Sequence, residues 1–548
     1  MLQWAARGLE AKERNDWQTG YDLLTQAIDE WPENPELLAA LAQCAWWLQR
    51  YDRSFEYRQR AYAANYKIGD RVNAARIAVK LACDYFVLRK QLAVARGWLA
   101  SAAELLSECP ECAANAELEL ARGLLTPQAS QGLKLEALER AIQLARRYGS
   151  RDVEMMASHT KGQVLIAHGH PHEGVELMDR AAAAAVGEQF GPYASTVIYC
   201  QTIAVCETIG DLERATEWSD VTLELSERNA VKGLPDSCRV HRAAILRLHG
   251  AWAEAEAEAR LVVDVLRATP DVYALAVGEL AEIQRRRGEL ESAWALASDA
   301  VAAGTAPEPT LSLLIADREG VEAAYYRLAK ALRVRAPNRF FRAWLIPAFT
   351  EIAIACGRPE AAEKHVADLE ESAALTGTPF FLAAADSAHG RLLAARGDLP
   401  AAQSKLEAAV ERWTETAIPF EASRDRLALA EVLLAAGDWA GAATEASEAV
   451  AGLERLGAAA ELAKARRLFA RTVPSRGSHP LPGSLTRREL EIVGLIGRGL
   501  SSAEIAPRLF ISKRTADSHV DHIRNKLGLG SRKAIAAWAV AQGLVRAD

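Results

Sequence analysis

Residues 513–533 carry the side chains whose types and spacing are best suited to binding another molecule. Lys513 and Arg514 stand together with Thr515 at the start of a helical pattern, and a helix N-terminus with cations favours phosphates. Polar side chains then recur every three or four residues, which places them on one helix face. They are Arg514, Asp517, Ser518, Asp521 and Asn525. Such a face suits the edges of bases in a major groove.

Serine and threonine residues predict four helix starts around this segment. Two of them have a glutamate three residues later, which is the capping-box arrangement. The caps are Thr486 with Glu489, Ser501 with Glu504, then Ser512 and Ser531, while Gly499 and Gly528 end the first and third helices. Apolar stripes at helical spacing predict a shared core. They are Ile492, Val493 and Ile496, then Ile505, Ala506 and Leu509, then Ala516, Val520, Ile523 and Leu527. The join at 510–512 is short enough for a helix-turn-helix.

Charge separates this end of the chain from the rest. Residues 475–548 hold 12 Lys and Arg against 6 Asp and Glu, a net charge of +6. Residues 1–474 hold 53 against 66, a net charge of −13. A small basic helical unit indicates double-stranded DNA as the simplest partner. The alternative is a helical module that docks a protein, and the acidic Asp517 and Asp521 favour it.

The C-terminal segment resembles the LuxR-type DNA-binding domain. The resemblance rests on Leu485-Thr486-x-x-Glu489, Gly499-Leu500-Ser501, Glu504-Ile505-Ala506, Leu509-Phe510-Ile511-Ser512, Thr515, His519-Val520, Ile523 and Lys526-Leu527. It implies a helix-turn-helix at about 502–521, base-facing Asp517, Ser518 and Asp521, and a dimer contact on a fourth helix at 532–542. The DNA-binding residues expected from sequence and resemblance together are Lys513, Arg514, Thr515, Asp517, Ser518, Asp521, Arg524, Lys526, Arg532 and Lys533.

Three positions depart from the family pattern. Asp517 and Asp521 stand where many members carry lysine, and carboxylates accept hydrogen bonds from cytosine rather than guanine. Pro507 removes one backbone hydrogen bond from the second helix, which predicts a kink or a shortened helix. Ser502 and Ala503 replace an Asn-Lys pair, which removes one lysine from the phosphate-contacting set.

A repeat of about 40 residues fills residues 1–472. Each clear copy has a helix-ending glycine, a Leu or Trp two residues later, and an alanine five residues later. Clear copies begin at Gly210, Gly250, Gly288, Gly397 and Gly437, looser ones at Gly169, Glu319 and Gly357, weaker ones near Asn15, Gln49 and Lys90, and the least regular near Gln131. This pattern predicts about twelve helical hairpins, each closed by a left-handed residue and stacked on its neighbours. The Leu or Trp is expected to fill the hairpin interior.

The repeat region resembles the tetratricopeptide family, with HEAT-like repeats as the competing interpretation. The resemblance implies an extended concave surface that binds a peptide, a protein or a small effector. The predicted fold class is therefore all-α, a long tetratricopeptide-like α-solenoid followed by a small four-helix LuxR-type helix-turn-helix domain. The predicted boundaries are 1–472 for the solenoid, 473–484 for a Gly, Pro and Ser-rich linker, and 485–548 for the DNA-binding domain.

Several other functions lack support in the sequence. There is no phosphate-binding Gly-x-x-x-x-Gly-Lys-Ser/Thr motif and no nucleophile elbow, so neither an ATPase nor another enzyme is expected, and no cofactor. His168, His170 and His172 lack accompanying metal ligands and indicate a solvated loop. Cys109 and Cys112 are expected to be structural, and all eight cysteines reduced in a cytoplasmic protein. No segment predicts a signal peptide or a membrane span.

The sequence therefore predicts a cytoplasmic, bacterial-type transcription regulator. It should bind a pseudo-palindromic DNA site as a homodimer, with an unidentified peptide, protein or small molecule in the solenoid groove. The opposite charges of the two parts suggest that the solenoid restrains the DNA-binding domain. The alternative is a helical-repeat scaffold whose basic terminal domain docks a protein rather than DNA.

Overall fold

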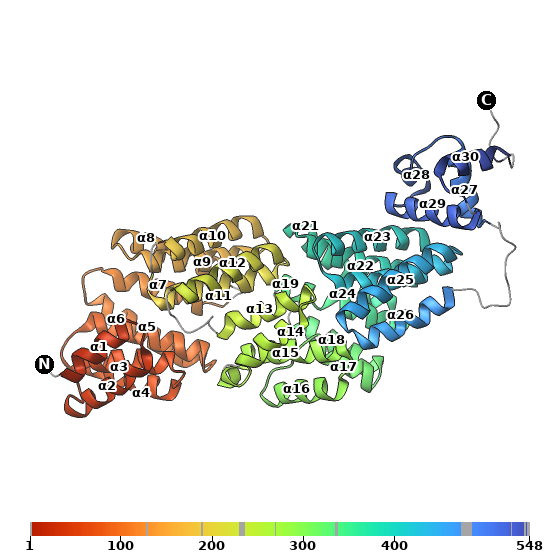
Figure 1. The fold of residues 1–548 in the computed structure, drawn as a ribbon. Helices are drawn as coiled ribbons and strands as arrows, with labels where there is room; N and C mark the ends of the chain where they lie inside the picture. The colour runs from red at the N-terminus through yellow and green to blue at the C-terminus, as the bar shows by residue number, and fades with distance from the viewer. Residues whose placement is uncertain are drawn as a thin grey trace. The chain divides into compact units, whose positions relative to one another are not determined.

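The computed structural model describes residues 3–544 except 128–129, 188–189, 229–235, 269, 335–337, 473–484, 528 and 542–543. Within these residues the secondary structure is helical, without strands, and consecutive helices pack as antiparallel pairs (Figure 1). The fold is an all-α helical repeat array followed by a small helical unit, as predicted. Among the described helices none is both long and apolar enough to cross a lipid bilayer.

The helices of the first half are α1 (Gln3–Glu13), α2 (Trp17–Glu30), α3 (Pro35–Trp47), α4 (Tyr51–Lys67), α5 (Arg71–Val87), α6 (Leu92–Ser107), α7 (Ala113–Leu125), α8 (Gln131–Arg147), α9 (Arg151–Ala167), α10 (Pro171–Gly187), α11 (Pro192–Thr208), α12 (Leu212–Arg228), α13 (Asp236–Leu248), α14 (Trp252–Val262) and the short 3₁₀ helix η1 (Val265–Ala268). Those of the second half are α15 (Pro270–Arg287), α16 (Leu290–Ala302), α17 (Thr310–Arg318), α18 (Val321–Val334), α19 (Arg339–Ala343), α20 (Ile346–Ala355), α21 (Pro359–Thr376), α22 (Pro379–Ala395), α23 (Leu399–Glu415), α24 (Pro419–Ala435), α25 (Trp439–Leu456), α26 (Ala459–Thr472), α27 (Arg487–Gly497), α28 (Ser502–Leu509), α29 (Lys513–Leu527) and α30 (Arg532–Ala541).

Left-handed residues close the hairpins where the sequence pattern places them. The glycines at 169, 210, 250, 288, 357, 397 and 437 all have positive φ, whereas in the copy that begins at Glu319 the left-handed residue is Gly320, one position later. Asn15, Gln49 and Lys90, at the start of the weaker copies, adopt the same conformation without being glycine, with φ of 59°, 58° and 55°. The irregular copy near Gln131 differs, because Ser130, the N-cap of α8, has φ of −107°. The repeat phase is therefore confirmed at ten of its twelve turns, and at Glu319 it is offset by one residue.

The alanine five residues after the turn is buried in the copies that carry it, while the Leu or Trp two residues after the turn is not always buried. Ala215, Ala255, Ala293, Ala324, Ala402 and Ala442 are all 0% exposed. Leu212 and Trp252 are buried as predicted, but Leu290 is 39% and Trp439 is 52% exposed. The prediction that this side chain fills the hairpin interior is wrong at those two positions. A small residue therefore stands at this position, which is alanine in the copies named above and Gly20, Ser54 or Gly174 in others.

The described chain divides into two compact units, residues 1–205 with 217–238, and residues 206–216 with 239–548. In the first unit, α9 and α10 approach most closely at Gly162 and Gly174. A Cβ on either glycine would lie 2.5 Å from the carbonyl oxygen of the other. The two helix backbones are therefore in direct contact, and only glycine fits at either position.

Cys200 of α11 and Cys238 of α13 form a disulfide in this first unit, with their Cα atoms 5.1 Å apart. The prediction that all eight cysteines are reduced is wrong for this pair. The two lie 38 residues apart, and the stacking of one hairpin on the next brings them together. Cys109 and Cys112 are free, in agreement with the sequence analysis.

In the second unit, ion pairs link helices of different hairpins, both neighbouring ones and ones far apart in the sequence. Arg391 of α22 lies 2.6 Å from Asp425 of α24, and Arg286 of α15 lies 3.2 Å from Glu421. Burial by itself raises the pKa of Glu282, but Arg285 and Arg286 reverse the effect and hold that pKa well below its ordinary value. These side chains neutralise one another, so the charges remain buried inside the array.

Alanine at Gly162 should destabilise the first unit by about 1–3 kcal/mol, because the added methyl group meets the Gly174 backbone. Gly97 of α6 is the matched control, since a Cβ there meets no atom within 4 Å. Gly97→Ala should instead stabilise the protein by about 0.5–1 kcal/mol, through lower chain entropy in the unfolded state. Denaturant unfolding of both variants checks this, and equal effects would contradict the close helix contact.

Candidate nucleic-acid interface

Helices α27 to α30 surround one small apolar core. Ile492 of α27, Ile505 of α28, Ile523 of α29 and Ile535 of α30 are all 0% exposed. The apolar stripes predicted from helical spacing point into this core, with Leu509 and Leu527 packed at its margin. Four short helices therefore hold one another in a fixed arrangement.

Capping hydrogen bonds set the start of each helix at the predicted residue. Thr486 and Glu489 form one capping box, in which the Thr486 N–H donates to Glu489 Oε2 at 2.7 Å. Ser501 and Glu504 form the second, and the hydrogen bonds from Ser501 lower the pKa of Glu504. Ser512 and Ser531 accept from the N–H groups of Thr515 and Ala534, at 3.0 and 3.2 Å. All four predicted caps are confirmed.

The turn between α28 and α29 is the predicted join at 510–512. Helix α28 has only eight residues and runs through Pro507, so it is short as expected. Phe510 ends it in the left-handed conformation, with φ of 55°, and the Ile511 N–H donates to the Ala506 carbonyl at 3.0 Å. This tight turn fixes where the N-terminus of α29 begins.

One cation predicted to contact DNA holds the unit together. Lys526 Nζ of α29 lies 2.7 Å from Glu489 Oε2 at the start of α27, and the Glu489 side chain is fully buried. Glu489 thus caps its own helix and also binds α29. Because its charge is engaged by a buried carboxylate, Lys526 positions α29 relative to α27.

Two further predicted cations also have partners inside the unit. Arg532 donates to the Leu500 carbonyl at 2.8 Å and to Ser502 Oγ at 3.0 Å, which joins α30 to the start of α28. Arg524 pairs with Asp521 on the surface of α29 at 3.1 Å. Arg532 is therefore in a structural position, whereas Arg524 partly neutralises a carboxylate predicted to face bases.

The remaining predicted residues lie on the outer side of α29 or beside it. Lys513 and Arg514 are exposed at its N-terminus, and Asp517 and Asp521 are exposed one and two turns later. Ser518 is half-buried on this side, and Lys533 is exposed at the start of α30. The structure therefore brings two cations and two carboxylates together on a surface open to solvent.

The other flank of α29 contacts the last helices of the repeat array. Thr515 Oγ1 donates to Glu407 Oε1 of α23 at 3.3 Å, and His519 Nε2 lies 3.3 Å from Asp438 Oδ2, at the N-cap of α25. Further along the same flank, Thr444 Oγ1 of α25 lies 3.0 Å from His522 Nε2.

The sequence analysis missed the repeat residues of this contact. Glu407, Asp438 and Thr444 lie 78 to 108 residues from their partners in α29. No local pattern connects such distant positions. Asp438 had one indirect signal, because it directly follows the helix-ending Gly437 of a clear repeat copy.

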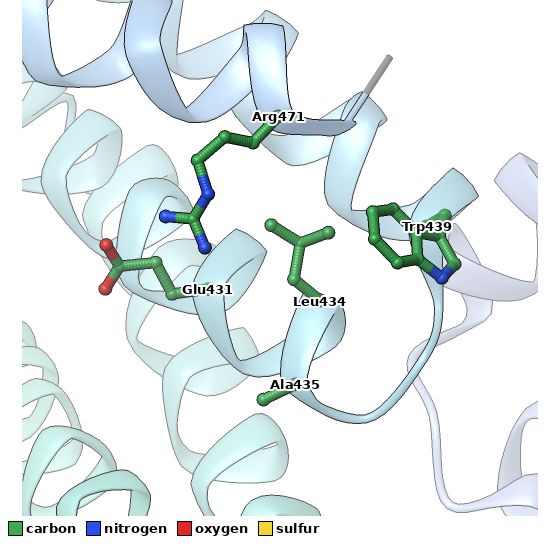
Figure 2. Close-up of a pocket in the computed structure, with 5 residues that line it drawn as sticks. All are labelled: Glu431, Leu434, Ala435, Trp439 and Arg471. Carbon is green, nitrogen blue, oxygen red and sulfur yellow. The ribbon is translucent and has the colours of Figure 1, made fainter. Parts of the chain in front are cut away.

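A separate cavity of about 510 Å³ opens near the end of the array, between α24, α25 and α26. Its lining combines an indole ring, an apolar floor and two opposite charges, from Glu431, Leu434, Ala435, Trp439 and Arg471. In Figure 2 the Arg471 side chain extends toward Glu431, and Trp439 lies beyond Leu434. The exposed Trp439 thus forms one wall of a cavity.

No group of three or more His, Cys, Asp or Glu side chains that could hold a metal ion occurs in the described part of the chain. His168, one of three alternating histidines, instead has its Nδ1 2.7 Å from the Val164 carbonyl oxygen. That hydrogen bond belongs to the end of α9.

The geometry defines a helix-turn-helix unit, and comparison with known families agrees. Residues 483–539 match the family described as bacterial regulatory proteins, LuxR family. The match covers all of α27, α28 and α29 and most of α30. The C-terminal unit is thus a LuxR-type DNA-binding domain.

Curated relatives match this chain over short stretches. HTH-type transcriptional regulators of Mycobacterium bovis and Mycobacterium tuberculosis are 44% identical over 70 residues, which is 13% of this chain and 8% of theirs. The oxygen regulatory protein NreC of Staphylococcus aureus is 43% identical over 61 residues, 11% of this chain and 28% of its own. The similarity therefore spans a small part of each relative.

Among solved structures, the crystal structure of the APC/C hetero-tetramer Cut9-Hcn1 aligns with 85% of this chain and 95% of its own. The TM-score is 0.45 and the sequence identity is 13%.

Replacing Lys526 with methionine should destabilise the helix-turn-helix unit by about 1–3 kcal/mol, because the buried carboxylate of Glu489 loses its cation. Lys533→Met is the matched control, since Lys533 is exposed in the same unit. Hydrogen exchange of the α27 and α29 amides in the full chain measures the effect. Similar exchange in both variants would show that the ion pair does not hold the unit together.

Proposed function

We propose that this chain is a transcription regulator that binds double-stranded DNA through α29. The observation that carries the proposal is the LuxR-family match on a unit whose α29 has a solvent-exposed, cationic N-terminus and a polar outer face. An α-helix with such a face fits the major groove. Under this proposal the chain is a DNA-binding protein and not an enzyme.

The residues of α29 divide into two roles. Lys513 and Arg514, at the positive end of the α29 helix dipole, contact phosphates and set the position of the helix. Asp517, Ser518 and Asp521 face the base edges, where carboxylates accept hydrogen bonds from cytosine N4. Thr515, Arg524 and Lys533 lie at the margins of this surface, while Lys526 and Arg532 act by holding the helices in place.

The DNA site is a pseudo-palindrome bound by a homodimer. Dimerisation through α30 is supported by its outer side, where Val540 is 41% exposed and Trp538 is half-buried. Two-fold symmetry of the protein then places the half-sites one helical turn, or a multiple of it, apart. The proposed domains are residues 1–472 for the repeats and 485–548 for the DNA-binding unit, joined by 473–484.

The repeat array senses an effector or a partner. The cavity beside Trp439 supports this role, because it joins an aromatic wall to a cation and a carboxylate, the mixture found in small-molecule sites. Trp439 directly follows Asp438, which contacts His519 of α29. A ligand in this cavity that moves Trp439 would therefore also move Asp438, and so change the contact between Asp438 and His519.

Removing the two cations at the start of α29 should weaken DNA binding and its salt dependence together. For Lys513→Ala with Arg514→Ala, the slope of log K against log salt should fall by about 2, since each phosphate contact contributes about 0.9. Arg96→Ala with Arg180→Ala is the control, because both are exposed in the repeats and remove the same charge. Titration of a labelled duplex at several salt concentrations measures the slopes, and equal slopes in the two variants would reject the assignment.

If Asp517 recognises a base, its substitution should change the sequence preference of DNA binding, whereas loss of a phosphate contact should not. Selection of bound duplexes from random DNA should give a two-fold symmetric motif for the wild-type chain. With Asp517→Ala, the preference at one position of each half-site should relax by about 1–3 kcal/mol, the range for one base contact. The rest of the motif should persist. An unchanged motif would place Asp517 outside the groove, and no motif from either chain would favour the scaffold alternative.

A further inference from the structure

The contact between α29 and the last repeats is polar and confined to one flank of the helix. Thr515, His519 and His522 follow one another at spacings of four and three residues, so they share one side of α29. Each faces a polar side chain of the array, from Glu407, Asp438 and Thr444 respectively. The array thus presents a surface whose side chains match this flank one by one. We call it the α23/α25 surface.

Glu407 occupies the N-terminus of α29. Its carboxylate accepts the Thr515 hydroxyl at 3.3 Å and also the backbone N–H of Ser512, the N-cap of this helix. A helix N-terminus binds anions through free N–H groups and its positive dipole end, and a DNA phosphate is one such anion. A carboxylate already bound there takes the place that a phosphate would fill.

Asp438 adds a second carboxylate one turn further along. It caps α25 by accepting the Gly441 N–H at 2.9 Å, and it faces His519, which is 2% exposed. Burial raises the pKa of Asp438, but the hydrogen bond and charge of His519 outweigh burial and lower it. The carboxylate therefore stays ionised against α29.

A helix inside the major groove has no room for a second surface on its flank. The groove is about 12 Å wide and a helix with its side chains is about 10–12 Å across, so both flanks approach the phosphate walls. The α23/α25 surface covers one of these flanks. Asp517 and Asp521 remain exposed, yet α29 cannot enter the groove while this surface is in contact with it.

The charges of the two parts favour the same contact. Residues 1–474 carry a net charge of −13 and residues 475–548 carry +6. The acidic partner attracts the basic unit at long range, as DNA does, and Glu407 and Asp438 place two of its carboxylates where the helix would meet the duplex.

We propose that the α23/α25 surface, formed by Glu407, Asp438 and Thr444, binds the chain's own α29 in competition with DNA. The inference rests on the proposed DNA-binding function and specifies how it is restrained. DNA binding then requires that α29 dissociate from this surface. An effector acts by changing the equilibrium between bound and dissociated α29.

The test compares the full-length wild-type chain with a Glu407→Gln and Asp438→Asn double variant. Both substitutions keep shape, and asparagine still caps α25. The control is Asp398→Asn with Glu448→Gln. Asp398 caps α23 at the equivalent position one repeat earlier, and Glu448 is exposed on α25. Because both double variants lose the same charge, general attraction to DNA changes equally. Thermal unfolding confirms that each remains folded.

The probe is a labelled mixed-sequence duplex at low salt, because phosphate-driven binding needs no knowledge of the operator. The test variant should bind it roughly tenfold more tightly than the control, since two polar contacts that oppose binding are weakened. A single Thr444→Val variant should show a smaller gain. Equal affinities for the test variant and the control would overturn the competition while the DNA-binding function stands. Absence of DNA binding by every chain would overturn the proposed function, and the competition with it.

Discussion

The close approach of two helix backbones at each hairpin is the constraint on which the repeat array depends. A left-handed residue ends the first helix of most hairpins, and a small residue stands where the second helix meets it, because a larger side chain would separate the two. Once the turn and this helix contact are fixed, the direction in which every other side chain of the hairpin points is fixed as well. Asp438 illustrates the consequence. It follows the left-handed Gly437, caps α25, and is thereby placed against His519 of α29.

In the C-terminal unit, a buried carboxylate has the corresponding role. Glu489 caps α27 and binds Lys526 of α29, so the start of one helix and the end of another are fixed to the same group. The cations of the unit differ in function for this reason. Those engaged inside, such as Lys526 and Arg532, determine where α29 lies. Those left in solvent at its first turn, Lys513 and Arg514, are available to an external anion.

Local rules explain how much of this structure the sequence predicts. Caps, left-handed turns and apolar stripes depend on residues within a few positions of one another, and the repeat phase even located Asn15 and Gln49 without a glycine. Contacts set by stacking follow no such rule. The Cys200–Cys238 disulfide, the exposure of Trp439 and the contact of Glu407 with Thr515 each depend on how distant hairpins meet. The DNA-facing side of α29 was predictable, and what covers its other flank was not.

The character of the contact between α29 and the repeats suits a reversible restraint. It consists of a few polar pairs, and a hydrogen bond in water contributes only about 0.5–1.5 kcal/mol. A ligand shifts the equilibrium between restrained and released α29 only by the difference in its affinity for these two states. A restraint of a few kcal/mol is small enough for such a difference to overcome. A large apolar interface would hold α29 too firmly for that. Salt weakens attraction to the acidic array and to DNA alike, because both act on the same basic helix. The choice between them therefore depends on the specific groups at the N-terminus of α29, where a carboxylate and a phosphate compete for the same N–H donors.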